Sequence, residues 1–198
     1  MKKTMVMLGL LLMVGAFFIP AAEEPCQPRS FAITLGAGGR NFSNNLYKDV
    51  YGGTPVIYSF DFAVRVIRPL EIFLHSDYLS VNGKTTYTKE GTTLKITPLE
   101  LGFRYILSQN KSCKQKIFPY LGAGAGYYLI KEEFAAGVPI EPVDEKRLGF
   151  FAEGGVRFYF SKSLFIDAKL KYISVSVNLE DTTKLGGLAY IGGLGFSF

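Results

Sequence analysis

Three short segments repeat one pattern of residues that could build a buried network of charges. Each places an acid, a small residue and an arginine at alternate positions: Asp61-Phe-Ala-Val-Arg65, Glu100-Leu-Gly-Phe-Arg104 and Glu153-Gly-Gly-Val-Arg157. In a helix the acid and the arginine would be neighbours, but in a strand they lie roughly 13 Å apart on one face. Each charge then needs a partner from another strand, and a closed sheet supplies one. We expect one charge network: Asp61, Arg65, Glu100, Arg104, Glu153, Arg157, Asp167, Lys169 and Lys171.

The single histidine, His75, is the residue best suited to acid–base chemistry. Ser76 and Asp77 follow it, and in a strand His75 and Asp77 share a face while Ser76 points the other way. A nucleophile would therefore have to come from another strand, and no feature of the sequence selects one. We interpret His75 as a histidine bonded to a neighbouring carboxylate, and we expect no catalytic residue.

We expect neither a metal site nor a cofactor. Two cysteines and one histidine offer no ligand spacing. The alternate glycines of Gly122-Ala-Gly-Ala-Gly126 continue a strand pattern instead of opening a helix, so they do not form a phosphate loop. We interpret them as space inside a sheet that has to close around its own side chains.

The elements that would hold these residues are eight segments whose hydrophobic side chains alternate with a period of two, as in strands. The segments are 31–38, 56–67, 70–81, 99–107, 118–130, 148–160, 164–173 and 185–198. One face of each is apolar or aromatic, and the other carries small or charged residues. Leu94 and Ile96 fall out of phase with Leu99, so we expect a bulge or an edge irregularity near Thr97-Pro98, where proline cannot donate a hydrogen bond.

The connections between these segments alternate in length. Arg68-Pro69 and the run 161–163 are short turns, whereas 40–54 and 131–146 are long and rich in polar residues. Outer-membrane barrels typically have an even number of strands, with short turns on one rim and long loops on the other. The connection 108–116 lies on the rim of the short turns but is longer than they are.

Alternation does not say which face is inside, and a soluble lipocalin-like barrel would turn the apolar face inward. Eight strands enclose only enough room for side chains of moderate size. The large apolar face would overfill that space: Tyr58, Phe60, Phe62, Phe103, Tyr105, Phe150, Phe158, Phe196 and Phe198. The chain also has no tryptophan, whereas lipocalins share a Gly-x-Trp near their first strand. We therefore predict that the aromatic face meets lipid.

The first 22 residues have the form of a secretory signal. Lys2 and Lys3 precede an apolar run that is too short to span a bilayer, and small residues close the segment at Ala21 and Ala22. Without it, 22 − 2 = 20 basic and 17 acidic residues remain. That balance is too mild for a nucleic-acid partner. We predict a cleaved signal over 1–22 and one barrel domain over 23–198.

These features resemble the small eight-stranded outer-membrane β-barrels of Gram-negative bacteria, the OmpA-like, OmpX-like or opacity-protein type that is grouped as porin-family β-barrel domains. The C-terminal strand is similar to the segment that the barrel-assembly machinery reads in such proteins, here Gly193, Phe196 and Phe198, although Ile191 stands where a polar residue is usual. The fold class implied is an all-β, antiparallel, up-and-down transmembrane barrel. The resemblance also implies an outer-membrane location, periplasmic termini, and contact with outer-membrane lipid and lipopolysaccharide.

That topology places Cys26 and Cys113 at the same periplasmic end. Because the periplasm permits oxidation, we predict a disulfide between them. Two unpaired thiols are the alternative.

Fold does not choose a role. We expect a monomeric, non-enzymatic structural or surface-binding barrel with a filled lumen, which meets a possible extracellular ligand through its long loops. A narrow pore for small solutes and a lipid A acyl-modifying enzyme are the alternatives.

Overall fold

Our computed structural model describes residues 29–52, 54–84, 91–107, 116–134, 143–179 and 181–198. The predicted signal over 1–22 and both cysteines, Cys26 and Cys113, lie outside these residues, so the signal and the disulfide stay predictions. The elements are β1 (Phe31–Phe42), α2 (Asn45–Tyr51), β2 (Val56–Ile67), β3 (Leu70–Lys84), β4 (Gly91–Ile106), β5 (Ile117–Phe134), β6 (Val143–Tyr159), β7 (Leu164–Leu179), β8 (Asp181–Lys184) and β9 (Gly187–Ser197).

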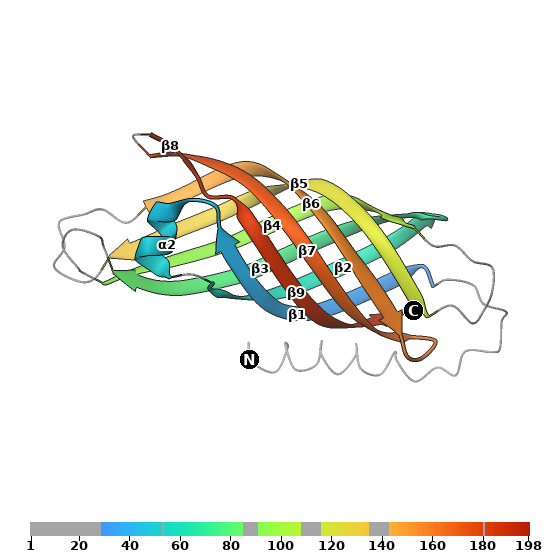
Figure 1. Ribbon diagram of the computed structural model, residues 1–198. Coiled ribbons are helices and arrows are strands. Elements are labelled where there is room, and N and C mark those ends of the chain that lie inside the picture. The colour runs from blue at the N-terminus through green and yellow to red at the C-terminus, as the bar shows by residue number, and fades with distance from the viewer. Residues whose placement is uncertain (1–28, 53, 85–90, 108–115, 135–142, 180) are drawn as a thin grey trace, which may run out of the picture.

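Eight antiparallel strands close into a barrel (Figure 1). Each of β1 to β6 pairs with the next strand along the chain, β6 pairs with β7, β7 pairs with β9, and β9 returns to β1. The short β8 pairs only with the end of β7 and is not part of the wall. This arrangement confirms the predicted fold class.

The apolar face of every wall strand is on the outside. Phe60, Phe103 and Phe158 are 42%, 57% and 42% exposed. Glu100 and Arg104, which alternate with Phe103 on β4, are fully buried. The alternation therefore separates an aromatic outer surface from a charged interior, and it excludes the inward-facing arrangement of a lipocalin-like barrel.

β1 begins and β9 ends side by side at one end of the barrel, which we call the terminal rim. Backbone hydrogen bonds join Phe31 N to Phe198 O (3.0 Å) and Phe198 N to Phe31 O (2.9 Å). The short turn between β2 and β3, which contains the cis Arg68-Pro69 peptide, and the turn between β6 and β7 lie at this rim. α2 and β8 lie at the opposite end, the loop rim (Figure 1).

Several strands are longer than predicted. β3 continues to Lys84, β5 to Phe134, and β6 begins at Val143, so much of the segment 131–146 is strand and not loop. Hydrogen bonds between strands are made by the backbone and need no apolar side chain. Strand pairing therefore continues past the alternating apolar residues from which the strands were predicted. The helix α2 was not predicted either, and it lies inside the expected loop 40–54.

Of the bulge or edge irregularity expected near Thr97-Pro98, the irregularity is present and the bulge is not. β4 keeps one register with β5 throughout, and Leu94, Ile96 and Pro98 continue the inward face of Glu100. The irregularity is a gap in the ladder to β3, where Asp77 and Tyr78 have no partner on β4. A register shift occurs instead between Arg65 and Ile67 on β2. No helix in the described ranges is long and apolar enough to cross a membrane.

Candidate functional site in the barrel interior

The interior holds acidic and basic side chains in similar numbers. Six carboxylates are buried: Asp61, Glu71, Asp77, Glu100, Glu153 and Asp167. Five Arg and Lys residues are buried with them, and Arg65 is half-buried: Arg40, Arg65, Arg104, Arg157, Lys169 and Lys171. Glu132, Glu145 and Arg147 are further half-buried charges on the inward faces of β5 and β6, nearer the loop rim. Similar numbers of opposite charges are what a buried ionic core requires, because an unpaired charge is costly to remove from water.

Arg104 on β4 lies between two carboxylates from other strands. Its guanidinium donates to Glu153 on β6 at 2.6 Å and to Asp61 on β2 at 3.0 Å. The same group lies over the rings of Phe73 and Tyr120, 4.2 Å and 4.5 Å from their centroids. Arg104 is therefore held by charge on two sides and by aromatic faces on two more, an arrangement that suits a planar guanidinium.

Nearer the terminal rim, Glu71 accepts hydrogen bonds from two arginines. Arg157 on β6 donates across the barrel at 2.9 Å and Arg65 donates from the neighbouring strand at 2.8 Å. Asp167 accepts a hydrogen bond from the Tyr120 hydroxyl at 2.8 Å and lies 3.9 Å from Arg157. The acid and the arginine of each sequence repeat thus find partners on other strands.

Nearer the loop rim, Lys171 on β7 joins two further acids. Its ammonium donates to Glu100 at 2.9 Å and to Asp77 at 2.5 Å. The Tyr128 hydroxyl donates to the other oxygen of Glu100. Gly126 on β5 gives Glu100 its space, because a Cβ built there would lie 2.6 Å from the Glu100 Cγ. A side chain larger than that of glycine at position 126 would therefore collide with Glu100.

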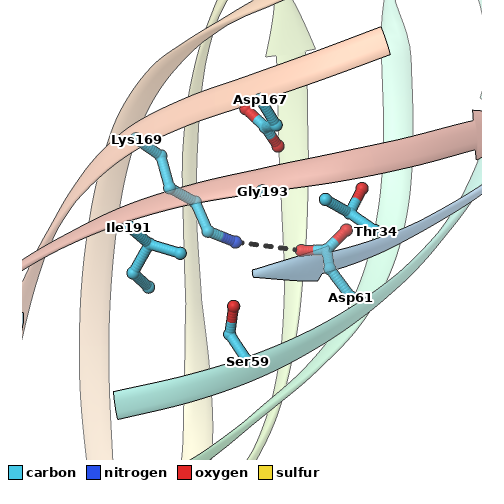
Figure 2. A pocket seen from close by; sticks show the side chains of 7 residues that line it. All are labelled: Thr34, Ser59, Asp61, Asp167, Lys169, Ile191 and Gly193. Atoms are coloured by element: carbon cyan, nitrogen blue, oxygen red, sulfur yellow. Dashed lines mark hydrogen bonds and ion pairs between the residues drawn. The ribbon is translucent and has the colours of Figure 1, made fainter. Parts of the chain in front are cut away.

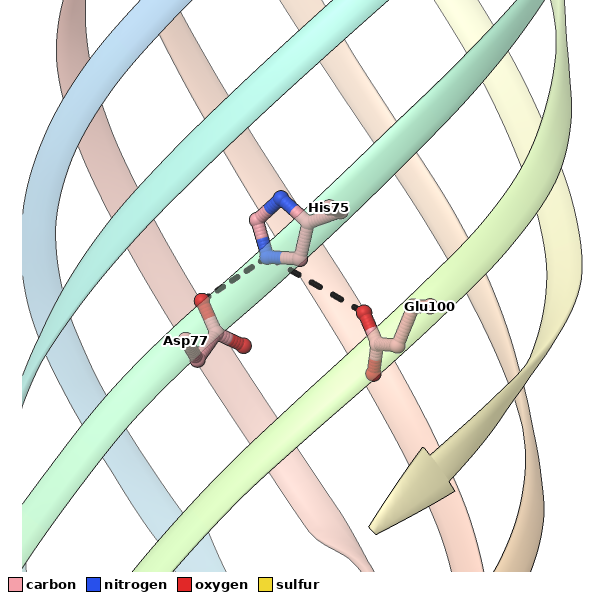
Figure 3. A group of neighbouring side chains, drawn as sticks. All are labelled: His75, Asp77 and Glu100. Atoms are coloured by element: carbon pink, nitrogen blue, oxygen red, sulfur yellow. Dashed lines mark hydrogen bonds and ion pairs between the residues drawn. The ribbon is translucent and has the colours of Figure 1, made fainter.

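His75 on β3 contacts both halves of this network, and Figure 3 shows it beside Asp77 and Glu100. Its Nδ1 is 3.3 Å from the Lys169 ammonium and 3.3 Å from Asp61. Nε2 lies 2.8 Å from Asp77 Oδ1, a contact that Figure 3 shows. His75 therefore has a carboxylate within hydrogen-bond distance of each ring nitrogen.

His75, Asp77 and Glu100 come close enough together to hold a metal ion, with ligand atoms within 4.8 Å of one another. The cation that these acids share, however, is the ammonium of Lys171, which contacts both carboxylates. The geometry therefore describes an internal ion pair, in which lysine takes the place that a metal would need.

A small space lies beside Lys169, on the side of the barrel formed by β1, β2, β7 and β9 (Figure 2). It is lined by Thr34, Ser59, Asp61, Asp167, Lys169, Ile191 and Gly193. Lys169 crosses it to reach Asp61 at 3.3 Å. Two atoms in its lining, Thr34 Oγ1 and Asp167 Oδ2, have no hydrogen-bond partner among the described residues. Other buried atoms without such a partner lie elsewhere in the interior: Arg40 Nε, Arg65 Nε, Glu153 Oε2, Arg157 Nε and Arg157 Nη2.

Apolar and aromatic side chains close both ends of the charged interior. At the terminal rim, the ring of Tyr159 lies 4.9 Å from that of Phe165 and 5.4 Å from that of Phe118. At the loop rim, buried side chains from the strands and α2 pack together: Phe42, Tyr47, Tyr51, Ile57, Leu79, Leu94, Ile96 and Ile130. The charges are thus enclosed between two plugs and do not line an open channel.

The sequence pattern missed three members of the network. Glu71 and Asp77 share the inward face of β3 with His75, but no arginine follows them at the spacing of the repeat. Arg40 fell in a predicted loop, although it continues the alternation of Thr34 on β1 and donates to Leu185 O at 2.7 Å. Continuing the alternation into the loops could have found it.

The predicted C-terminal signal residues lie in β9 and just after it. Gly193 lines the interior, where a Cβ would lie 2.7 Å from Leu35 O. Phe198 is 46% exposed and stacks on Phe31, with ring centroids 5.7 Å apart. Phe196 stacks on Phe198 at 6.1 Å. These residues join the last strand to the first, and their reading by an assembly machinery stays a prediction.

Solved structures with the same fold are small barrels of Gram-negative outer membranes. Neisserial surface protein A (NspA) matches with a TM-score of 0.64 at 15% identity, over 87% of this chain and 100% of that one. The outer-membrane protein OprG of Pseudomonas aeruginosa matches with a TM-score of 0.67 at 14% identity, over 87% and 97%. The attachment invasion locus protein Ail of Yersinia pestis, solved with the heparin analogue sucrose octasulfate, matches at 0.57 and 12% identity, over 87% and 100%.

No protein-family model matches the sequence. No curated protein matches it either. The structural likenesses therefore define a class of fold, the small eight-stranded outer-membrane barrel, and carry no particular activity.

Proposed function

We propose that this chain is an integral outer-membrane β-barrel protein. The observation that carries the proposal is the continuous apolar and aromatic outer wall, since every wall strand exposes large hydrophobic side chains. In water such a surface would drive aggregation, whereas in a bilayer it is the surface required. The predicted signal over 1–22 supports export, and the neighbouring folds are outer-membrane proteins.

We further propose that the terminal rim faces the periplasm and the loop rim faces outward. Short turns gather at the first rim, as in other barrels of this class. The protein would then enter the membrane through the barrel-assembly machinery, with Gly193, Phe196 and Phe198 as the residues read. We expect it to act as a monomer.

The role we propose is structural or surface-binding, with the loop rim as the binding end. The interior supports this, because most of its charges are paired with one another and enclosed at both ends. The loop-rim ends of β3, β4, β5 and β6 extend past the apolar wall and would present polar side chains outside the membrane. In Ail, the same fold was solved with a heparin analogue bound.

The pore alternative finds less support. A solute would have to pass two plugs and separate charges that are within hydrogen-bond distance. In a planar bilayer we expect no stable ohmic current. A steady current carried by the purified protein and lost on boiling would reverse the ranking of pore and filled barrel.

The enzyme alternative has no specific observation in its favour. The described hydrogen-bond partners of His75 are carboxylates and an ammonium, and no hydroxyl or thiol is among them.

The experiment for the proposed function is a gel-mobility assay on the outer-membrane fraction. A folded barrel runs differently before and after boiling, so we expect a heat-dependent shift in that fraction. Recovery of the mature protein in the soluble periplasmic fraction, with no mobility shift, would contradict the proposal. Protease added to intact cells should leave the terminal-rim turn 161–163 intact if the loop rim faces outward.

A further inference from the structure

Three lysines on neighbouring strands point outward near the loop rim, and we call them the lysine cluster: Lys95 on β4, Lys131 on β5 and Lys146 on β6. Lys95 and Lys131 are direct partners across the β4–β5 ladder. Lys146 pairs with Leu129 and is thus diagonal to Lys131. The side chains of Lys95 and Lys131 are 37% and 56% exposed, and Lys146 is exposed. The proposed function gives none of these three residues a particular role.

The cluster lies directly above the lipid-facing wall. Lys131 is two positions beyond Leu129, and Lys146 is two positions from Leu148, so each is the first charged side chain after the outward apolar ones. The nearby acids, Glu133 and Asp144, are two positions farther along the same faces. In a membrane the order from the hydrocarbon outward is therefore apolar side chain, lysine, acid.

Positive charge at this level is confined to one side of the barrel. The corresponding outward positions next to the apolar wall on other strands are Ser80 on β3, Ser174 on β7 and Asn41 on β1, all exposed and uncharged. A general membrane anchor would place lysines around the whole barrel. A cluster on three adjacent strands instead fits one molecule that binds from one side.

The acids do not satisfy the cluster. Lys95 pairs with Glu133 at 2.9 Å and Lys131 with Asp144 at 3.1 Å, but these acids are 54% exposed, and exposed pairs contribute little stability. None of the described ion pairs includes Lys146. Lys95 and Lys131, as like charges directly opposite each other, repel. A doubly charged anion among the three ammonium groups would remove that repulsion and could displace the acids.

We propose that the lysine cluster binds the phosphate group of a phosphorylated lipid whose acyl chains lie against the outer wall below it. A phosphate at the boundary between hydrocarbon and headgroup meets the lysines before the acids, and the apolar wall under Leu129 and Leu148 accepts the chains. This inference rests on the proposed function, because only a barrel inserted in a membrane presents the cluster at that depth.

The test is native mass spectrometry of the full-length mature protein in phosphatidylcholine nanodiscs that contain a small fraction of lipid A. Wild type is compared with Lys131→Gln/Lys146→Gln, and with a matched control, Lys116→Gln/Lys162→Gln, at the terminal rim. We expect wild type and control to retain phosphorylated lipid A and to discriminate against the dephosphorylated form. The cluster variant should retain about 25-fold less, at about fivefold per lysine.

Equal retention by the cluster variant and wild type would overturn the inference. So would an equal loss in the control variant, equal retention of dephosphorylated lipid, or displacement of the lipid by inorganic phosphate at matched concentration. Heat-dependent gel mobility of each protein checks insertion first. If wild type fails to enter the nanodisc, the proposed function fails and takes this inference with it; if it enters without discriminating, only this inference fails.

Discussion

Arg104 illustrates how each buried charge of this barrel depends on more than one strand. Its guanidinium joins Asp61 and Glu153, which belong to strands on either side of β4 but not adjacent to it. Neither acid could be buried alone, since several kcal/mol oppose the removal of an ion from water. The arginine therefore stabilises two carboxylates at once, and the energy of either pair cannot be separated from the other.

Replacing Arg104 by leucine should destabilise the folded barrel strongly. The change leaves Asp61 and Glu153 buried without their main cation, which typically costs about 3–5 kcal/mol. We expect a lower urea midpoint for unfolding in detergent. Arg68→Leu, at an exposed turn position, is the matched control and should unfold like wild type. An unchanged midpoint for Arg104→Leu would mean that the charges are not paired as described.

Replacing Lys171 by alanine should convert the internal ion pair into a metal site. Without the ammonium, Asp77 and Glu100 lack their shared cation, and His75 completes a set of three ligands. We expect a lower urea midpoint that rises again when the variant is refolded with Zn²⁺ and falls with a chelator. Wild type should respond to neither. A variant equally insensitive to Zn²⁺ would show that the three ligands do not converge once the lysine is gone.

The inward charged residues of β2, β4, β6 and β7 could be predicted from the sequence, because alternation puts them on one face of each strand. Their partners could not, because pairing across a barrel depends on strand tilt and on the reach of each side chain. Arg157 bonds to Glu71, a residue outside the repeat, and not to the acid of another repeat. His75 was expected to have a carboxylate partner, and its contact with Lys169 has no signal in the sequence.

Among the elements, α2 has the clearest effect on the loop rim. The helix packs Tyr47 and Tyr51 against Phe42 and the buried ends of the strands. The Tyr51 hydroxyl donates to Glu132 on β5 and lies 3.2 Å from the Thr92 hydroxyl on β4. These contacts fix the first loop over the interior, so the helix forms part of the plug that closes this end.

The docking of α2 should fail at high pH. Burial, with Glu132 and Glu145 nearby, raises the pKa of the Tyr47 hydroxyl to about 12, and burial with the Glu132 hydrogen bond raises the pKa of Tyr51 as well. An unfolded tyrosine ionises near pH ~10. The stability that these buried hydroxyls contribute is therefore complete below about pH 10 and is lost as the pH rises through about 12.

The measurement is the tyrosinate absorbance of wild type minus that of Tyr47→Phe as pH is raised. The difference should titrate near pH 12. Tyr58→Phe, on the outer wall, is the control for loss of any one tyrosine. A difference for Tyr47→Phe that titrates near pH 10 would mean that α2 leaves its hydroxyl in water.

Strand existence was predictable because each strand alternates over the length of the apolar wall. Strand ends were not predictable. β3, β5 and β6 continue into segments where both faces are mainly polar, so apolar and polar residues no longer alternate there. The helix escaped prediction for a similar reason: it is one of the shortest elements and lies in a run whose asparagines favour turns. Leu94 and Ile96 suggested a bulge because they are apolar and inward, a combination that belongs to the plug at the loop rim.

For the molecule as a whole, the reversed surface is the defining property. Large hydrophobic side chains cover the outside and ionic groups fill the inside, the opposite of a water-soluble barrel. This reversal could be predicted because one face of the strands is apolar and aromatic throughout, whereas the other carries the acids, the basic residues and most of the glycines. Residue size alone does not decide it, since eight aromatic side chains are buried inside: Phe42, Tyr47, Tyr51, Phe73, Tyr120, Tyr128, Phe151 and Phe165. The particular ligand or role could not be predicted, because the outer wall is common to every barrel of the class.

Replacing Ala123 by arginine should test the outer wall. Ala123 is exposed in the middle of the outward positions from Ile117 to Leu129 on β5. In lipid vesicles an arginine near the bilayer centre costs about 2–4 kcal/mol. We expect a clear loss of stability in urea unfolding for this variant, and little change for Ser80→Arg, which lies beyond the apolar wall on β3. Equal stability of the two variants would contradict a lipid-facing wall.

The distribution of ion partners also constrains how the chain can enter a bilayer. Apart from Arg65 with Glu71 on the β2–β3 hairpin, the closest buried pairs of Arg or Lys with Asp or Glu join strands that are not neighbours: β4 with β2 and β6, β6 with β3, and β7 with β2, β3 and β4. Neighbouring strands are joined by longer contacts of 3.8 to 3.9 Å, Arg104–Glu71 between β4 and β3, and Arg157–Asp167 and Lys169–Glu153 between β6 and β7. A hairpin that crossed a bilayer alone would keep only those longer contacts and would leave most of its charges without their closest partners. Insertion one hairpin at a time is therefore costly for this chain, and we expect the strands to pair their charges while the interior still has access to water.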